Sequence, residues 1–445
     1  MALADPMTIA AYVVGAGTGL ALAVWLVRSR ADARRHEAVQ ARSEKLGHTE
    51  PASLHPKIDE HKCICTGACI TSCPEKDVLG MVDGRPQLIK PSACVGHGEC
   101  LRACPVDAIE LVIGTARRGV DLPLLGADFQ TNVPHLYIAG ELGGMGLIHN
   151  AVNQGVQAVR GLAKRGSEAA GVLDLLIVGA GPAGMAAGLE AQALGLRYLI
   201  VEQDTLGGAL RSYPRHKIVM THPVVLPLHG RVQLRRTTKE ALLELWEEIT
   251  RTHSLALSTG ERVVDIARDA GGMFEVKTSR GAHRARHVLL AIGRRGSPRK
   301  LGVPGEELEK VTYRLLDPEQ YRGQRCVVFG GGDSAIETAL MLAAEPGAEV
   351  TLVHRGAVFD RCKPDNHDAL ERAIAAGKLS VRTEARPISI TATEVDLEVK
   401  SGAVRLPNDY VFVCIGGELP TAWLGKVGVE VRTWKGEAHP AAGRA

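Results

Sequence analysis

The fold of this chain is decided by residues 173–188, which read LDLLIVGAGPAGMAAG. The first six residues form an apolar run that predicts a buried strand. The glycines that follow stand at Gly179, Gly181 and Gly184, the GxGxxG spacing that opens a helix directly after a strand. A second apolar run at 197–201 ends in Glu202. This succession predicts a parallel α/β unit that holds a dinucleotide, with its pyrophosphate at the helix N-terminus and its ribose on Glu202.

A second unit of the same kind lies further along the chain. An apolar run at 326–329 is followed by Gly330, Gly332 and Ala335, which repeat the spacing with alanine in third place. The next apolar run, 350–353, ends in His354 and Arg355 instead of an acid. An arginine at this place suits a 2′-phosphate, which an acid would repel. We therefore expect FAD in the first unit and NADPH in the second.

The composition narrows the class of protein. A chain of 445 residues has room for about two to four domains. With 45% hydrophobic and 23% charged residues the chain is globular. A net charge of +3 and an aromatic content of 4% argue against a nucleic-acid binder. Seven of the ten cysteines lie between positions 63 and 104, which in a chain of this size indicates a metal site, not a disulfide scaffold.

The clustered cysteines form two similar runs, CICTGACITSCP at 63–74 and CVGHGECLRACP at 94–105. Each ends in C-x3-C-P, the ending of the bacterial iron–sulfur motif, in which the last cysteine binds the other cluster. Residues 57–113 therefore resemble the bacterial dicluster ferredoxins. The resemblance implies two clusters, expected to be 4Fe-4S, one bound by Cys63, Cys69 and Cys104 and the other by Cys73, Cys94 and Cys100.

Both runs depart from the motif at its second ligand position. That position is Thr66 in the first run, with Cys65 one place early, and His97 in the second. Cys65 and His97 are the candidate fourth ligands, because histidine can bind iron in place of cysteine. Two alternatives stay open. The clusters could hold three irons or have an open corner, or the site could bind zinc, which sets of cysteine and histidine also suit.

The two dinucleotide units, with Ala291-Ile-Gly293 between them, resemble the thioredoxin-reductase-like flavoproteins. In that family the NADPH domain is inserted in the FAD domain, and the chain then returns with a strand, a Gly-Asp pair and a helix facing the flavin. Here the return is missing after Gly417, and its counterpart lies upstream at 133–155. The corresponding residues are Gly140, Glu141 (in place of Asp) and Gly146. We therefore expect a circularly permuted FAD domain, in which the dipole of the helix near Gly146 faces the flavin.

The remaining cysteines bear on the reaction. Thioredoxin reductases carry a C-x-x-C in the inserted domain, whereas this sequence has no cysteine between the first fingerprint and Cys326. Cys326 and Cys414 lie in apolar strands and are expected in the core. Cys362, in the polar stretch FDRCKP, is expected at the surface. Other members of the group also lack the pair, including the ferredoxin–NADP reductases and the bacillithiol-disulfide-reductase-like proteins.

The N-terminus predicts a membrane anchor. Residues 8–27 carry no charge and would span about 30 Å as a helix. No Lys or Arg precedes this segment, and four arginines follow it at positions 28, 30, 34 and 35. The positive-inside rule then places a single uncleaved span in the inner (cytoplasmic) membrane, with the rest of the chain in the cytoplasm.

The resulting prediction is a mixed α/β chain with seven segments. These are an anchor (1–28), a partly helical linker (29–56), an α+β ferredoxin-like domain (57–113), the permuted FAD segment (114–168), the FAD domain (169–298), the NADPH domain (299–425) and a tail (426–445). We expect an NADPH-dependent oxidoreductase that passes electrons between NADPH, FAD and two iron–sulfur clusters, in either direction, to an unidentified acceptor. The family resemblance implies a homodimer. The rival hypotheses are a disulfide or low-molecular-weight thiol reductase that uses Cys362, and a redox sensor with slow turnover.

Overall fold

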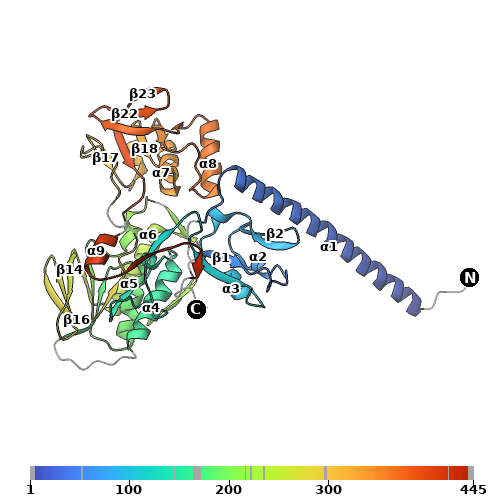
Figure 1. The fold of residues 1–445 in the computed structure, drawn as a ribbon, viewed down its shortest axis with the longest axis horizontal. Coiled ribbons are helices and arrows are strands. Elements are labelled where there is room, and N and C mark those ends of the chain that lie inside the picture. The colour runs from blue at the N-terminus through green and yellow to red at the C-terminus, as the bar shows by residue number, and fades with distance from the viewer. Residues whose placement is uncertain are drawn as a thin grey trace, which may run out of the picture.

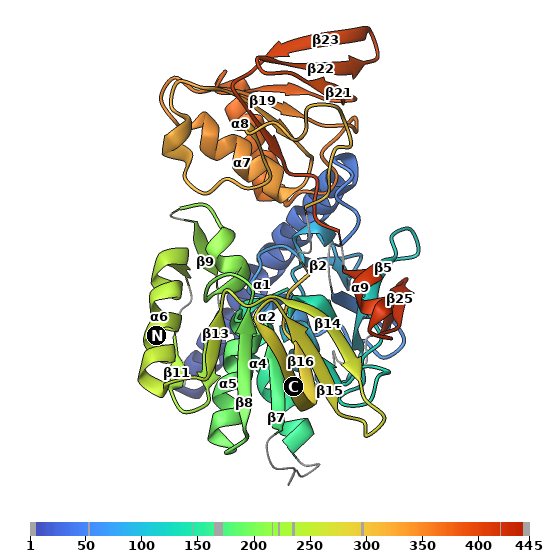
Figure 2. The same ribbon diagram turned by 90° about the vertical axis from the view of Figure 1, so that its left-hand side faces the viewer.

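The computed structural model describes residues 6–438 except 52–53, 145, 164–171, 216, 221–222, 234–235, 295–297 and 419. A long N-terminal helix leads into a small cysteine-rich domain, and two α/β bodies follow (Figure 1). Figure 2 shows the second α/β body above the first. We refer to them as the FAD body and the NADPH body, after the cofactors that the sequence predicts.

The FAD body is built on a seven-stranded sheet with the order β13-β8-β7-β16-β15-β14, in which β6 also pairs with β16. Its strands are β6 (Leu136–Ile138), β7 (Leu173–Val178), β8 (Tyr198–Glu202), β13 (Leu257–Thr259), β14 (Val263–Arg268), β15 (Phe274–Thr278) and β16 (Gly281–Leu290). The strands from β13 to β6 are parallel, while β14 and β15 form an antiparallel extension. Parallel strands that are buried on both faces have continuous apolar sequences, and the sequence LDLLIV of β7 is nearly so.

Helices and small hairpins complete the FAD body. The helices are α4 (Ile148–Ala163), α5 (Pro182–Ala193) and α6 (Lys239–His253), with short turns at η2 (Glu141–Gly143) and η3 (Gly208–Ser212). The hairpins join β9 (Ile218–Met220) to β12 (Arg236–Thr238) and β10 (Val224–Leu226) to β11 (Gly230–Val232). Because β6 and α4 come from the segment upstream of β7, part of this body precedes the first dinucleotide loop in the chain.

The NADPH body carries a five-stranded parallel sheet with the order β17-β24-β18-β19-β20. Its strands are β17 (Val311–Thr312), β18 (Arg325–Phe329), β19 (Glu349–Val353), β20 (Ser380–Arg382) and β24 (Tyr410–Val413). Its helices are α7 (Asp333–Ala343), α8 (Pro364–Ala375) and the turn η4 (Pro318–Tyr321). An antiparallel sheet of β21 (Arg386–Ile390), β22 (Glu394–Val399) and β23 (Gly402–Pro407) covers it.

The cysteine-rich domain has two matching halves. Its elements are β1 (His55–Ile58), α2 (Ala68–Ser72), β2 (Leu79–Val82), β3 (Arg85–Leu88), η1 (Pro91–Ala93), α3 (Glu99–Ala103) and β4 (Ile109–Ile113). The short helices α2 and α3 each follow a glycine with positive φ, Gly67 and Gly98. Each is followed by a cysteine in an extended conformation, Cys73 and Cys104. The repeat seen in the sequence is therefore a structural repeat.

The segment predicted as a tail (426–445) contains two strands in its described part, which ends at Ala438. After α9 (Thr421–Lys426), strand β25 (Val431–Trp434) pairs with β5 (Val120–Pro123), and β26 (Glu437–Ala438) pairs with β4. The Trp434 side chain is buried with Leu122 in the core of the cysteine-rich domain. Burial of this indole and the strand pairing hold the segment in place.

The helix α1 runs unbroken for 40 residues, from Pro6 to Lys45, and its first half projects from the body of the molecule (Figure 1). In the part of the chain that the structure describes, no helix is both long and apolar enough to cross a membrane. The predicted transmembrane anchor is therefore not supported. The apolar stretch is instead continuous with a charged half, of which residues 29–45 were expected to be only a partly helical linker. That half docks on β2, where the buried His36 accepts a hydrogen bond from the Met81 N–H (3.0 Å).

Candidate functional site

The first dinucleotide loop requires glycine for steric reasons. Gly179 adopts φ +106°, and a side chain there would also lie 2.6 Å from the Ala291 carbonyl oxygen. A Cβ on Gly184 would overlap the Gly179 carbonyl oxygen, so the helix α5 can approach the loop only without one. A Cβ on Gly181 would have no other heavy atom within 4 Å. The loop thus leaves room beside the N-terminus of α5, where a pyrophosphate binds favourably.

Glu202 holds this loop from the end of β8. Its buried carboxylate accepts hydrogen bonds from the Ala180 N–H (2.8 Å) and the Asp204 N–H (3.0 Å). The sequence predicted a ribose contact for Glu202. Each carboxylate oxygen can accept more than one hydrogen bond, so the loop contacts leave capacity for ribose hydroxyls.

The upstream segment completes the same site. Gly140, at the end of β6, adopts φ +88° and donates its N–H to Gln154 Oε1 (2.7 Å). A Cβ on Gly155 would overlap the Ala183 carbonyl oxygen, which shows how closely α4 packs on the start of α5. The Gln154 Nε2 is buried and has no hydrogen-bond partner among the described residues. An unpaired buried amide costs free energy, and an acceptor atom of a bound FAD would satisfy it.

Gln154 was not among the predicted site residues. The signal available in the sequence was its position on the helix after Gly140 and Glu141, one residue before the glycine that permits close packing on α5.

A cavity of about 630 Å³ opens beside Glu141. It is lined by Asp121, Glu141, Arg294, Arg299, Gly417, Glu418, Thr421 and Ala422. Burial lowers the pKa of the Arg294 guanidinium, and the nearby Glu141 carboxylate opposes that shift. In the sequence, Arg294, Arg295, Arg299 and Lys300 form a basic run, which we interpret as solvated charges in preference to ligands of the NADPH phosphates. Arg294 instead is half-buried and faces this cavity, while Arg299 is exposed and Arg295 lies outside the described residues.

The second dinucleotide loop lies between β18 and α7. Gly330 adopts φ +146°, and a Cβ there would overlap the Cys414 carbonyl oxygen. A side chain on Gly331 would overlap the imidazole of His354, so this ring lies directly over the loop. The ring also stacks on Phe359, with centroids 4.8 Å apart, and burial lowers its pKa. His354 therefore shapes the loop as a neutral group at pH 7.

Two exposed arginines stand near this loop. Arg355 follows His354, and the backbone of Arg361 bridges to Gly332. Ala335 lies buried in the first turn of α7, and Asp333 accepts hydrogen bonds from the Lys363 N–H and the Asn366 amide, both 2.7 Å. Arg361 was missed in the sequence. The signal available was a second arginine six residues after Arg355. Two guanidinium groups at the loop suit the 2′-phosphate of NADPH.

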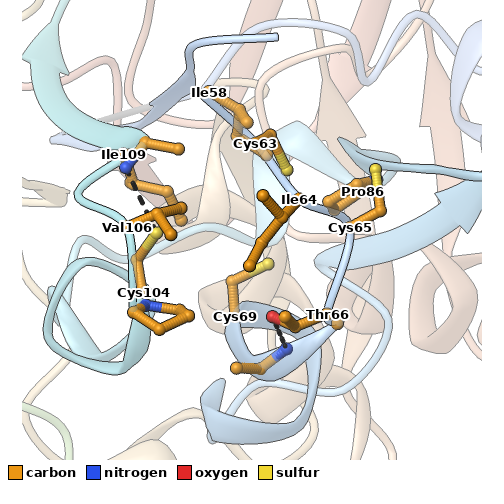
Figure 3. A pocket seen from close by; sticks show the side chains of 14 residues that line it. Ile58, Cys63, Ile64, Cys65, Thr66, Cys69, Pro86, Cys104, Val106 and Ile109 are labelled. Carbon is orange, nitrogen blue, oxygen red and sulfur yellow. Dashed lines mark hydrogen bonds between the residues drawn. The ribbon is translucent and has the colours of Figure 1, made fainter. Parts of the chain in front are cut away.

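The first cysteine set surrounds one pocket, to which Cys63, Cys65, Cys69 and Cys104 all contribute (Figure 3). Figure 3 shows Cys63, Cys69 and Cys104 on the sides of Ile64, and Cys65 beside Pro86. The Cys65 side chain also interacts with that of Cys63. Cys104 Sγ accepts a hydrogen bond from the Ala108 N–H (3.2 Å). Thr66 instead serves the loop, because its Oγ1 accepts a hydrogen bond from the Ala68 N–H (3.4 Å). The arrangement suits a bound cluster that takes Cys104 from the second run.

The second set consists of Cys73, Cys94 and Cys100 with His97 between them. Burial, with a smaller contribution from the nearby Cys73 thiol, raises the pKa of Cys94 to about 11 and that of Cys100 to about 12. Iron would supply the positive charge that such buried thiolates need. His97 Nε2 lies 3.7 Å from Glu75 Oε1. Within the described residues, no three His, Cys, Asp or Glu side chains are arranged to hold a single metal ion.

The scattered cysteines are in the interior. Cys326 is buried in β18 and Cys414 is half-buried, as expected for core residues. Cys362 is only 1% exposed, so the expectation that it lies at the surface was wrong. The turn that follows α1 covers it, with His48 Nε2 4.0 Å from its sulfur. Burial raises the pKa of Cys362 to about 12, which opposes a role as a nucleophile.

Two dinucleotide loops on two α/β bodies, joined to paired cysteine sets, define a pyridine-nucleotide flavoprotein with an iron–sulfur domain. The chain belongs to the pyridine nucleotide-disulphide oxidoreductase family, whose model matches residues 176–441. A 4Fe-4S dicluster domain matches residues 55–105. The predicted enzyme class, an NAD(P)H-dependent FAD/iron–sulfur oxidoreductase with FAD, NADPH and 4Fe-4S clusters, is thereby confirmed.

The relatives are reductases of two kinds. A ferredoxin–NADP reductase of Ignicoccus hospitalis is 31% identical, over 58% of this chain and 82% of its own. The bacilliredoxin reductase Bdr of Bacillus subtilis is 26% identical, over 58% of this chain and 80% of its own. Among solved structures, the bacillithiol disulfide reductase Bdr of Staphylococcus aureus matches with a TM-score of 0.53 and 26% identity, covering 58% of this chain and 80% of that one.

Proposed function

We propose that this chain transfers electrons between NADPH and its own iron–sulfur clusters through a bound FAD, and exchanges them with an external acceptor. The observation that carries the proposal is a contact between the two redox parts. His149, in the first turn of α4 on the FAD side, stacks on His97 of the second cysteine set. One relative is named a ferredoxin–NADP reductase, and this name supports electron exchange between NADPH and an iron–sulfur domain.

The residues have distinct tasks in this proposal. When bound, NADPH supplies a hydride, the flavin separates it into single electrons, and the clusters carry these one at a time. The loop at Gly179, Gly181 and Gly184 and the carboxylate of Glu202 would hold FAD. The loop at Gly330 and Gly332 with Arg355 would hold NADPH. The two cysteine sets would hold the clusters, with Cys65 and His97 as proposed fourth ligands.

The FAD domain is proposed to be circularly permuted. The pairing of β6 with β16 and the close packing of α4 on α5 support this, because both elements precede the first loop in the chain. The match to the family begins only at residue 176, after these elements. The boundaries 57–113, 114–168, 169–298 and 299–425 are kept as proposals, and so is the homodimer.

Flavin retention tests the permutation. Glu141→Ala removes the acid beside Gly140 and should raise the dissociation constant of FAD about tenfold, close to 1.4 kcal/mol. Glu398→Ala changes an exposed carboxylate on β22 and should leave FAD binding unchanged. Equal FAD affinity in both variants would count against a flavin role for the upstream segment.

The whole proposal is tested by anaerobic reduction. The reconstituted full chain is mixed with NADPH while flavin absorbance and low-temperature EPR are recorded together. Bleaching of the flavin together with new iron–sulfur signals is the expected result. Bleaching with oxidised clusters would reject the proposal.

The names of the Bdr relatives favour a second candidate, a disulfide or low-molecular-weight thiol reductase. It predicts NADPH-dependent loss of an added disulfide that Cys362→Ser abolishes. Burial of Cys362 beneath His48 opposes it, so we expect no such loss in either protein.

A further inference from the structure

We propose that the second cysteine set lies next to the flavin, that His149 and His97 join the two, and that the first set is the outlet to the external acceptor. This inference rests on the proposed function and adds an order to it. The electrons balance as follows. NADPH and two oxidised clusters give NADP⁺, two reduced clusters and one proton.

The flavin side of the contact belongs to the FAD site. His149 is the second residue of α4 and lies three residues after Gly146. A Cβ on Gly146 would lie 3.5 Å from the Glu141 side chain, so this turn lies against the acid that follows Gly140. Gly140 in turn bonds Gln154, whose unpaired Nε2 is the buried donor of the site. His149 is thus on the helix that carries Gln154, beside the proposed flavin pocket.

The cluster side of the contact belongs to the second cysteine set. His97 lies between Cys94 and Cys100, and its side chain is 10% exposed. Its ring is nearly parallel to that of His149, with an interplanar angle of 10° and a centroid separation of 6.5 Å. The loop before His97 packs closely on the preceding chain, because a side chain on Gly96 would lie 2.7 Å from the Leu54 carbonyl oxygen.

The first cysteine set has no comparable contact with the FAD body in the described structure. Every residue that lines its pocket comes from the cysteine-rich domain, between Ile58 and Ile109. Ile64, at the centre of this set, is 62% exposed, so a partner could approach the pocket closely. The two sets remain near each other, because α2, which carries Cys69, packs on α3, which carries Cys100. Electrons from NADPH would therefore pass from the flavin to the second set, then to the first set, and then to the acceptor.

The chain offers a matched pair of variants to test this order. Cys69 and Cys100 occupy equivalent positions in α2 and α3, and both are buried. Cys69→Ser should disrupt the first cluster and Cys100→Ser the second, as iron and sulfide content will verify. An adjacent cluster quenches flavin fluorescence, so Cys100→Ser should increase the emission per bound FAD while Cys69→Ser leaves it at the wild-type level. Higher emission in Cys69→Ser with unchanged emission in Cys100→Ser would overturn the inferred order, but it would not contradict the proposed function.

Reduction by NADPH gives the second readout. In Cys69→Ser, NADPH should still reduce the remaining cluster. The variant should no longer reduce cytochrome c, used as an artificial one-electron protein acceptor. In Cys100→Ser both reactions should fail, although the remaining cluster is still reduced by dithionite. If NADPH reduces neither cluster in the wild type, the proposed function itself fails, and this outcome is distinct from a wrong order.

His149 is tested as a positioning residue. His149→Ala removes the stacked ring and should slow cluster reduction about tenfold, equivalent to about 1.4 kcal/mol in the barrier. His149→Phe keeps a ring and should restore most of the rate. Flavin bleaching, cluster content and the EPR spectrum of dithionite-reduced protein should be unchanged in both. Equal rates in the wild type and His149→Ala would show that the contact does not contribute.

Discussion

Gly184 has a strict steric requirement, because a Cβ there would overlap the backbone of Gly179. We expect Gly184→Ala to push α5 away from the loop, to lower the free energy of unfolding by about 1–3 kcal/mol, and to release FAD. Flavin content after gel filtration and urea unfolding measure the two effects. The control is Gly425→Ala in α9, where the added methyl meets nothing within 4 Å and should be tolerated. Retention of FAD in Gly184→Ala would contradict the assigned loop.

The buried Glu261 gives the FAD body a pH-dependent stability. Burial alone would raise its pKa, but hydrogen bonds from Ser258, Thr278 and His283 outweigh burial and hold the pKa at about 2. Because this folded value lies below the ordinary value of 4.5, the carboxylate stabilises the fold above pH 4.5, and the stabilisation is lost as the pH falls toward 2.

Glu261→Gln should therefore cost about 1–3 kcal/mol at pH 7 and less as the pH falls. Urea unfolding at pH 7 and at pH 3.5 measures both values. A loss that is the same at both pH values would show that the charge of Glu261 is not responsible.

At the scale of elements, the pairing of β25 with β5 anchors the end of the chain. Trp434 on β25 is 3% exposed and packs in the core of the cysteine-rich domain. We expect Trp434→Ala to destabilise this domain by about 3–5 kcal/mol and to lower its iron content. Trp25→Ala, at a 62% exposed position on α1, should change stability by less than about 0.5 kcal/mol. Unaltered iron content and stability in Trp434→Ala would mean that the C-terminal strands are dispensable.

The elements show which parts of the fold a sequence can predict. The strand, loop and helix around Gly179 and the two cysteine runs are determined by residues close together in the chain, so their spacing predicts them. The place of β6 beside β16 was predictable from the Gly140–Glu141 pair, although the partners are far apart. The pairing of β25 and β26 was not, because VRTW has no feature that selects β5, some 300 residues upstream. The contact between Cys362 and His48 was also not predictable, because these two residues are 314 positions apart in the chain.

At the scale of the whole molecule, the end of α1 and the cysteine-rich domain contact the NADPH body. Arg42 forms an ion pair with Asp368 (2.6 Å), and Lys90 reaches Asp365 (3.5 Å). Both acids belong to α8, which lies beside the end of α1 in Figure 1. Exposed ion pairs contribute little stability on their own, so the buried His48 is the more important part of this contact.

His48 closes the contact over Cys362. Burial lowers the pKa of His48, so the ring is neutral at pH 7. Its Nε2–H donates a hydrogen bond to the Phe359 carbonyl oxygen (3.0 Å). We expect His48→Ala to open a path to the thiol and to raise alkylation of Cys362 by about tenfold, as measured by mass spectrometry of the native protein. Cys326 is the internal control, because it is equally buried but lies in β18. Its alkylation should not change. If both thiols react faster, the substitution has loosened the NADPH body as a whole. If neither thiol reacts faster, His48 does not shield Cys362. Only selective exposure of Cys362 would show that His48 joins the turn after α1 to the NADPH body.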